Sequence, residues 1–184
     1  MITIKNILVP TSVSTVSVPA IGYAASLAQD HEAEVVLLNV LRVEAIKKHM
    51  TGGYADGLAI PAEAGGIVQR QTDMDKFYAQ KKQLLLAFVH EKIGADLRKT
   101  VKITPLIRLG KIVEETLAAA TELRCDLIVM ASEEARLSRF FRGTVTERIM
   151  RQAPCPVLSM QPSAQIRLGE EERLQVRAID QWAA

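Results

Sequence analysis

The sequence lacks the features that mark several large classes of protein. It has two cysteines, Cys125 and Cys155, which lie far apart and without the spacing of a metal site. We interpret both as small core residues beside buried strands. No apolar run approaches the roughly 20 residues of a transmembrane helix, so no membrane span is predicted. The 23 basic and 21 acidic residues nearly cancel, which argues against a nucleic-acid partner.

Recognisable catalytic motifs are also missing. The sequence has no Ser-His-Asp set, no metal-ligand cluster, no Walker phosphate loop and no Gly-x-Gly-x-x-Gly fingerprint. The three histidines are scattered in polar contexts, and we interpret them as surface residues. An enzyme is therefore not predicted, although weak ATP hydrolysis stays open. The N-terminus runs into a strand pattern without a signal peptide, so we expect a cytoplasmic protein.

What the chain does contain is a regular alternation of strand and helix patterns. Apolar residues make up 48% of the 184 residues, enough for the core of one ordinary domain. The alternation predicts an α/β fold, a three-layer, doubly wound parallel sheet of five strands. Pro105 argues that the third strand lies at a sheet edge. Strands are predicted at 7–10, 34–41, 101–109, 126–131 and 156–160, and helices at 18–29, 72–97, 112–123 and from 144.

Two stretches lie outside this alternation. Glycines and Pro61 crowd residues 42–71, which we interpret as a long, mobile insert of functional importance or without order. The domain proper is expected to span residues 1–160. Residues 161–184 form a C-terminal extension with apolar residues that suit either a loosely ordered tail or a docking arm.

The segment around Gly143 is the best candidate for a binding site. Gly143 and Thr144 open the last helix, where free backbone N–H groups and the helix dipole favour an anion. Thr144 and Glu147 also match a capping box, in which the threonine side chain caps the helix and needs no ligand. The sequence leaves both interpretations open.

A family resemblance rests on the two ends of the domain. The opening KNILVPTSVSTVSVPAIGYAASLA and the closing CDLIVMAS, FFRGTVTERIM and APCPVLSM are similar to the universal stress protein family over residues 3–160. The segment from Gly143 to Arg148, together with Ala153 to Val157, is the most specific part. The resemblance implies an adenine nucleotide alpha hydrolase-like fold and a homodimer formed through the last strand. Many members bind ATP, and others do not.

The resemblance also implies where a nucleotide and Mg would bind. Adenine would lie at the ends of the first and second strands, and the phosphates at the start of the last helix. The cofactor-binding residues implied in this way are Pro10, Thr11, Ser12, Val40, Met130, Ala131, Gly143, Thr144 and Val145.

The chain departs from the nucleotide-binding pattern of this family at several positions. That pattern is a glycine, two residues, a second glycine, nine residues, then glycine with serine or threonine. Here Ala131 and Glu134 replace the first two glycines, and the spacer is one residue short. A carboxylate at Glu134 would repel a polyphosphate by about 1 kcal/mol, although nearby arginines can compensate. Ser12-Val13 stands where the family usually has aspartate and glycine.

Two functions follow as alternatives. The first is a cytoplasmic stress-response or regulatory protein that acts through protein contacts, with ATP binding weakened or absent. The second is an ATP or AMP sensor that uses the end of the first strand and Gly143-Thr144. In either case the apolar last strand is a pairing hazard unless it is covered. We expect it to pair with its copy in an isologous homodimer, with the C-terminal tail as the alternative cover. The dimer strand comprises Pro156, Val157, Leu158, Ser159 and Met160.

Overall fold

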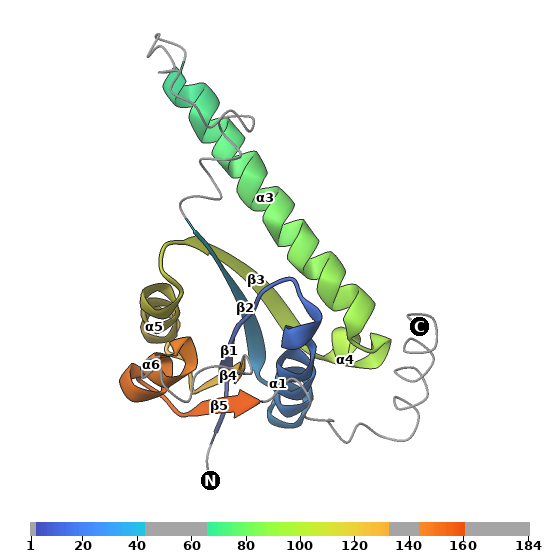
Figure 1. The fold of residues 1–184 in the computed structure, drawn as a ribbon. Helices are drawn as coiled ribbons and strands as arrows, with labels where there is room; N and C mark the ends of the chain where they lie inside the picture. The colour runs from blue at the N-terminus through green and yellow to red at the C-terminus, as the bar shows by residue number, and fades with distance from the viewer. Residues whose placement is uncertain (1–2, 43–65, 133–143, 161–184) are drawn as a thin grey trace, which may run out of the picture.

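A computed structural model describes residues 3–42, 66–132 and 144–160 of the chain, and five strands in these ranges form one sheet (Figure 1). The strand order is β3-β2-β1-β4-β5, and each neighbouring pair is parallel. The strands are β1 (Asn6–Pro10), β2 (Glu34–Leu41), β3 (Lys102–Leu109), β4 (Leu127–Ala131) and β5 (Val157–Met160).

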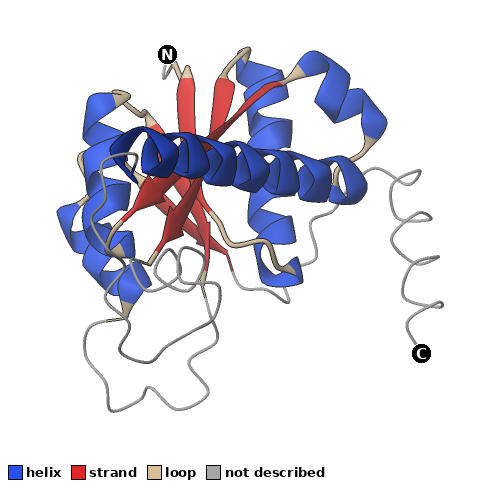
Figure 2. Cartoon of the chain, turned by 90° about the horizontal axis from the view of Figure 1, so that it is seen from above, coloured by secondary structure: helices blue, strands red, loops and turns tan. Residues whose placement is uncertain are grey.

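Helices cover both faces of the sheet, so the fold has three layers (Figure 2). The short helix η1 (Thr15–Ser17) leads into α1 (Val18–His31), and α3 (Gly66–Lys92), α4 (Ala95–Thr100), α5 (Ile112–Glu122) and α6 (Val145–Gln152) follow. On one face α1, α3 and α4 pack around a core that includes Ile21, Leu85 and Val35. On the other, α5 and α6 close a second core around Ile128 and Ile149.

The central strands are apolar because they are buried from both sides. Ile7, Leu8 and Val9 have no exposed surface, and the matching residues of β2 are at most 7% exposed. A parallel strand covered by helices on both faces needs this continuous apolar run rather than alternation. The predicted doubly wound α/β sheet is confirmed, including β3 at one edge, where Pro105 lies, and β5 at the other.

The long helix differs from its predicted bounds of 72–97. It begins at Gly66, so the last six residues of the expected insert, 66–71, are helical. Residues 67–71 contain no helix breaker, and the crowding of glycines ends at Gly66. The helix ends at Lys92, because Gly94 leaves helical geometry with φ −52° and ψ 145° and caps the separate helix α4.

The rest of the expected insert, 43–65, and the C-terminal extension, 161–184, lie outside the described residues. Within the part of the chain that is described, no helix is long and apolar enough to cross a membrane.

Candidate functional site at the switch point of the sheet

The strand order reverses between β1 and β4, which lie side by side at the centre of the sheet. The chain leaves β1 toward α1 on one face and leaves β4 toward α6 on the other. In open α/β sheets, ligands bind at the carboxyl ends of the strands where the order changes in this way. Pro10 and Ala131, the last residues of the two strands, therefore mark the candidate site.

The end of β1 is held firmly against β2. The backbone N–H of Thr11 donates to the Leu38 carbonyl at 2.8 Å, which extends the ladder one residue beyond the strand. Asn39 Nδ2 donates to the Thr11 carbonyl at 2.8 Å. Both Pro10 and Thr11 are buried, so they contribute to the floor of the site rather than to its surface.

Asn39 is a site residue that sequence reasoning missed. Its amide fixes the carbonyl of Thr11, the residue that follows β1. The available signal was one amide side chain within the otherwise apolar run of β2 after Glu34. A polar residue in a buried strand needs a hydrogen-bond partner, and here that partner is the neighbouring strand end.

The loop after β1 is closed by a network of hydroxyl groups. Ser12 Oγ lies 2.9 Å from Ser14 Oγ, and the Ser12 N–H donates to Ser17 Oγ at 3.3 Å. Ser17 is buried, whereas Val13, which follows Ser12, is 41% exposed. Ser12, where the resemblance led us to expect an aspartate, is thus a neutral hydroxyl with local partners.

The end of β4 presents little side-chain chemistry. Met130 is 4% exposed and packs into the core beneath α5 and α6, so only its backbone can face a ligand. Ala131 is half-buried. Ser132 donates its backbone N–H at 2.7 Å and its hydroxyl at 3.2 Å to the Met160 carbonyl, which ties β4 to the end of β5.

The start of α6 is capped by its own side chain. Thr144 Oγ1 accepts a hydrogen bond from the Glu147 N–H at 3.2 Å, which confirms the predicted threonine cap. Glu147 also pairs with Arg151 Nη2 at 2.7 Å, one turn further along the helix. Thr144 and Val145 are exposed, so a ligand can reach both.

The structure therefore brings part of the predicted site together. Pro10, Thr11, Ser12 and the half-buried Val40 follow adjacent strands, because β2 continues past the end of β1. Met130 and Ala131 lie on the strand beside them. Gly143, Glu134 and the arginines of the preceding loop lie outside the described residues, so the predicted charge balance of that loop stays a prediction.

Neither thiol is suited to nucleophilic chemistry at neutral pH. Burial, with further contributions from Cys155 and Asp126, raises the pKa of Cys125 to about 12. Burial also raises the pKa of Cys155. A thiolate is the reactive form of cysteine, so both side chains act as packing residues. Across residues 3–42, 66–132 and 144–160, no group of three metal-ligating side chains is assembled.

A doubly wound sheet with its candidate site at the switch point defines a class of α/β domains that bind small ligands at the carboxyl ends of their strands. Comparison with known proteins identifies the family. The sequence model of the Universal stress protein family matches residues 3–160, so the chain belongs to that family.

Individual relatives agree with this assignment. A universal stress protein of Methanocaldococcus jannaschii is 29% identical over 155 residues, which cover 84% of this chain and 80% of the relative. The solved structure of a universal stress protein in complex with cAMP has a TM-score of 0.58 at 16% identity, over 88% of this chain and all of the other. An AMP-bound family member from Arabidopsis thaliana has a TM-score of 0.54 at 16% identity, covering 91% and 99%.

Proposed function

We propose that this protein is a cytoplasmic regulatory protein of the universal stress type, which forms a homodimer through β5 and acts on a protein partner. In this proposal, nucleotide binding is weaker than in relatives with a complete glycine motif. The observation that carries the proposal is the second edge of the sheet. Among the described residues, β5 pairs with β4 alone, although it is apolar and only half-buried.

The hydrogen bonds of β5 show which backbone groups are free for a second copy. Pro156 and Met160 accept from β4 through Ile128 at 3.0 Å and Ser132 at 2.7 Å. In a parallel pair, alternate residues of a strand face the same neighbour. Residues 156, 158 and 160 therefore face β4, and the backbone groups of Val157 and Ser159 face outward. An antiparallel copy of β5 can pair with these two residues across a two-fold axis.

This geometry provides a test that leaves the core intact. Replacing Ser159 with Pro removes one outward N–H, and proline is tolerated on an edge strand at such a position. Ser159→Ala is the matched control, because it removes the hydroxyl and keeps the N–H. We expect Ser159→Pro to be monomeric and Ser159→Ala to be dimeric in sedimentation equilibrium. If Ser159→Pro has the same mass as the control, β5 does not form the interface.

The side chains at the switch point support the proposal that nucleotide binding is weak. The loop after β1 offers the neutral, internally bonded Ser12 and the exposed Val13 where relatives offer an acidic residue and glycine. Thr144 already uses its oxygen to accept the cap hydrogen bond. These residues leave backbone N–H groups as the main ligands for a phosphate, which favours low affinity.

A second candidate function is adenine-nucleotide sensing. It is favoured by the intact strand ends at the switch point and by the capped, exposed start of α6. Two structural neighbours are described with cAMP and with AMP bound, which supports the same candidate. Here Pro10, Thr11 and Val40 would surround the adenine, and Gly143, Thr144 and Val145 would bind the phosphates of ATP with Mg.

Calorimetric titration with Mg-ATP separates the two functions. The first predicts no heat of binding at micromolar ATP, and the second predicts a micromolar Kd. The double variant Ser12→Asp, Val13→Gly restores the pattern of the family at the first loop. It should bind more tightly than the wild type if these residues limit affinity, and an unchanged titration would remove them as the cause.

A further inference from the structure

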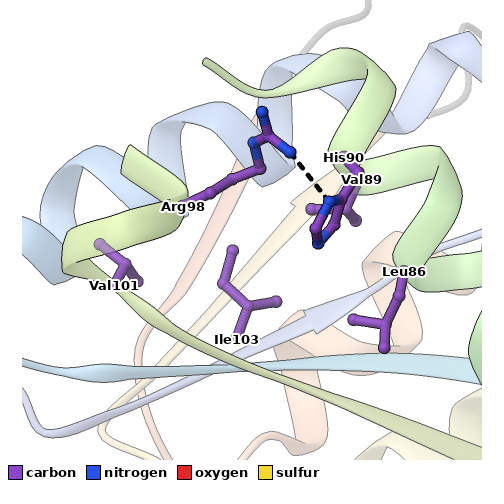
Figure 3. Close-up of a pocket in the computed structure, with 6 residues that line it drawn as sticks. All are labelled: Leu86, Val89, His90, Arg98, Val101 and Ile103. Atoms are coloured by element: carbon purple, nitrogen blue, oxygen red, sulfur yellow. Dashed lines mark hydrogen bonds between the residues drawn. The ribbon is translucent and has the colours of Figure 1, made fainter. Parts of the chain in front are cut away.

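A small cavity lies far from the switch point, beneath α3 and α4 at the β3 edge of the sheet. It has a volume of about 110 Å³ and is open to solvent on the side of the exposed His90. Figure 3 shows its lining side chains: Arg98 and His90 meet at the top of the view, Val89 lies beside His90, Ile103 lies below, and Val101 and Leu86 lie to the left and right. The apolar lining consists of Leu86, Val89, Val101 and Ile103.

Arg98 carries the unusual feature of this cavity. Its Nη1 donates to His90 Nδ1 at 2.9 Å, while its Nε is buried and has no hydrogen-bond partner among the described residues. Among the side chains that the structure describes, which do not include that of Asp96, no carboxylate forms an ion pair with this guanidinium. A buried donor on a charged group without an acceptor is costly, so such groups are normally satisfied by a partner or ligand.

Two carboxylates of adjoining elements have other partners. Glu34 Oε2 pairs with Lys102 at 2.8 Å, and Glu91 pairs with Lys92 at 2.7 Å. Because arginine can only donate, His90 accepts through Nδ1 and carries its proton on Nε2. The polar side of the cavity therefore presents hydrogen-bond donors and a positive charge, and its other walls are apolar.

We propose that this cavity binds a short-chain aliphatic monocarboxylate, a free acid of two to four carbons. The carboxylate would accept hydrogen bonds from Arg98 Nε and from an adjacent guanidinium N–H, since the planar arginine fork matches two carboxylate oxygens. The alkyl chain would lie against Val101 and Ile103. A phosphate fits less well, because four apolar side chains cannot replace its hydration.

The size of the cavity determines the expected order of affinities among acids of different chain length. A space of about 110 Å³ accommodates a ligand on the order of six non-hydrogen atoms. Each buried methylene should tighten binding about fourfold, so butyrate should bind more tightly than acetate. Longer acids would extend out of the cavity into solvent and should gain little further affinity. For ligands this small, the expected Kd is millimolar.

An NMR titration of the full-length protein with sodium butyrate tests the proposal. Sodium chloride at the same concentration controls for ionic strength. We expect saturable shifts of the backbone amides of residues 86–103 with butyrate and none with chloride. The absence of saturable shifts at tens of millimolar butyrate would overturn the proposal.

Variants then separate a ligand site from a structural role of Arg98. Arg98→Met should weaken binding at least about tenfold, because it removes the charged donors. Lys82→Met removes one positive charge from an exposed site on α3 and should bind as the wild type does. Ile103→Phe should block binding by filling the cavity while Arg98 stays in place.

Melting temperatures without ligand complete the test. Arg98→Met removes a buried, unpartnered N–H and also the hydrogen bond to His90, so the two effects should largely cancel and leave the melting temperature within about 2 °C of the wild type. If it melts several degrees lower, Arg98 is a structural link between α3 and α4, and the ligand proposal fails. It also fails if Arg98→Met or Ile103→Phe binds butyrate as tightly as the wild type.

Discussion

Replacing Thr144 tests what the most specific motif of the chain does. Thr144 Oγ1 accepts one hydrogen bond, from the Glu147 N–H at 3.2 Å. Loss of such a cap by Thr→Ala typically costs about 1 kcal/mol of stability. In a chain of 184 residues, this corresponds to a fall in melting temperature of roughly 2–4 °C. Thr144→Ser keeps the acceptor and should melt close to the wild type.

The cost should stay near 1 kcal/mol because the site is exposed and α6 is short. Urea unfolding of the wild type, Thr144→Ala and Thr144→Ser measures the difference in the free energy of unfolding directly. Equal stability of all three proteins would refute the capping role. If the hydroxyl also holds a phosphate, Mg-ATP should stabilise the serine variant more than the alanine variant. An equal effect would leave Thr144 with the cap alone.

Three further experiments, on two variants and one thiol, test other parts of the structure. Gly110→Ala should cost about 1–3 kcal/mol in urea unfolding, because Gly110 has φ +151° and an added Cβ would lie 2.7 Å from Glu115 Oε1; wild-type stability would contradict this. Hydrogen bonds from Lys102 and Thr104 lower the pKa of Glu34. The Glu34 carboxylate therefore stabilises the fold at pH values above its ordinary pKa. This stabilisation is lost as the pH falls through the lowered pKa of the folded protein. Glu34→Gln should therefore be about 1 kcal/mol less stable than the wild type at pH 7, with a difference that shrinks in acid; a constant difference would be inconsistent. Cys125, with a pKa of about 12, should react slowly with iodoacetamide at pH 7.5 and rapidly in urea, and fast labelling of the folded protein would show that the thiol is accessible.

The strands could be predicted because a buried strand appears in the sequence as a short apolar run. Because helices cover both faces of β1 and β2, these strands are continuous apolar runs. Pro105 indicates an edge strand because proline has no backbone N–H to donate to a neighbouring strand. The predicted start of α3 was wrong because the preceding glycines suggested a loop that continues to residue 71, whereas the helix begins at Gly66. Helix boundaries depend on backbone geometry near glycine, and sequence patterns constrain that geometry only weakly.

Contacts between distant segments were beyond sequence reasoning. Thr144 could be predicted as a cap because its partner is three residues away. The bond from Asn39 to Thr11 joins residues 28 apart, and the bond between Arg98 and His90 crosses a break between two helices. His90 is exposed, as expected, but its bond to Arg98 could not be predicted. Such pairs depend on how elements pack, which periodicity does not show.

Native mass spectrometry of the purified protein tests the proposed function most directly, because one spectrum reports both subunit number and retained ligand. The account predicts a species of twice the chain mass of 20.2 kDa without a bound nucleotide. A monomer at micromolar concentration would contradict the pairing of β5. A dimer that retains an adenine nucleotide would contradict the weakened site and make the sensor the better description.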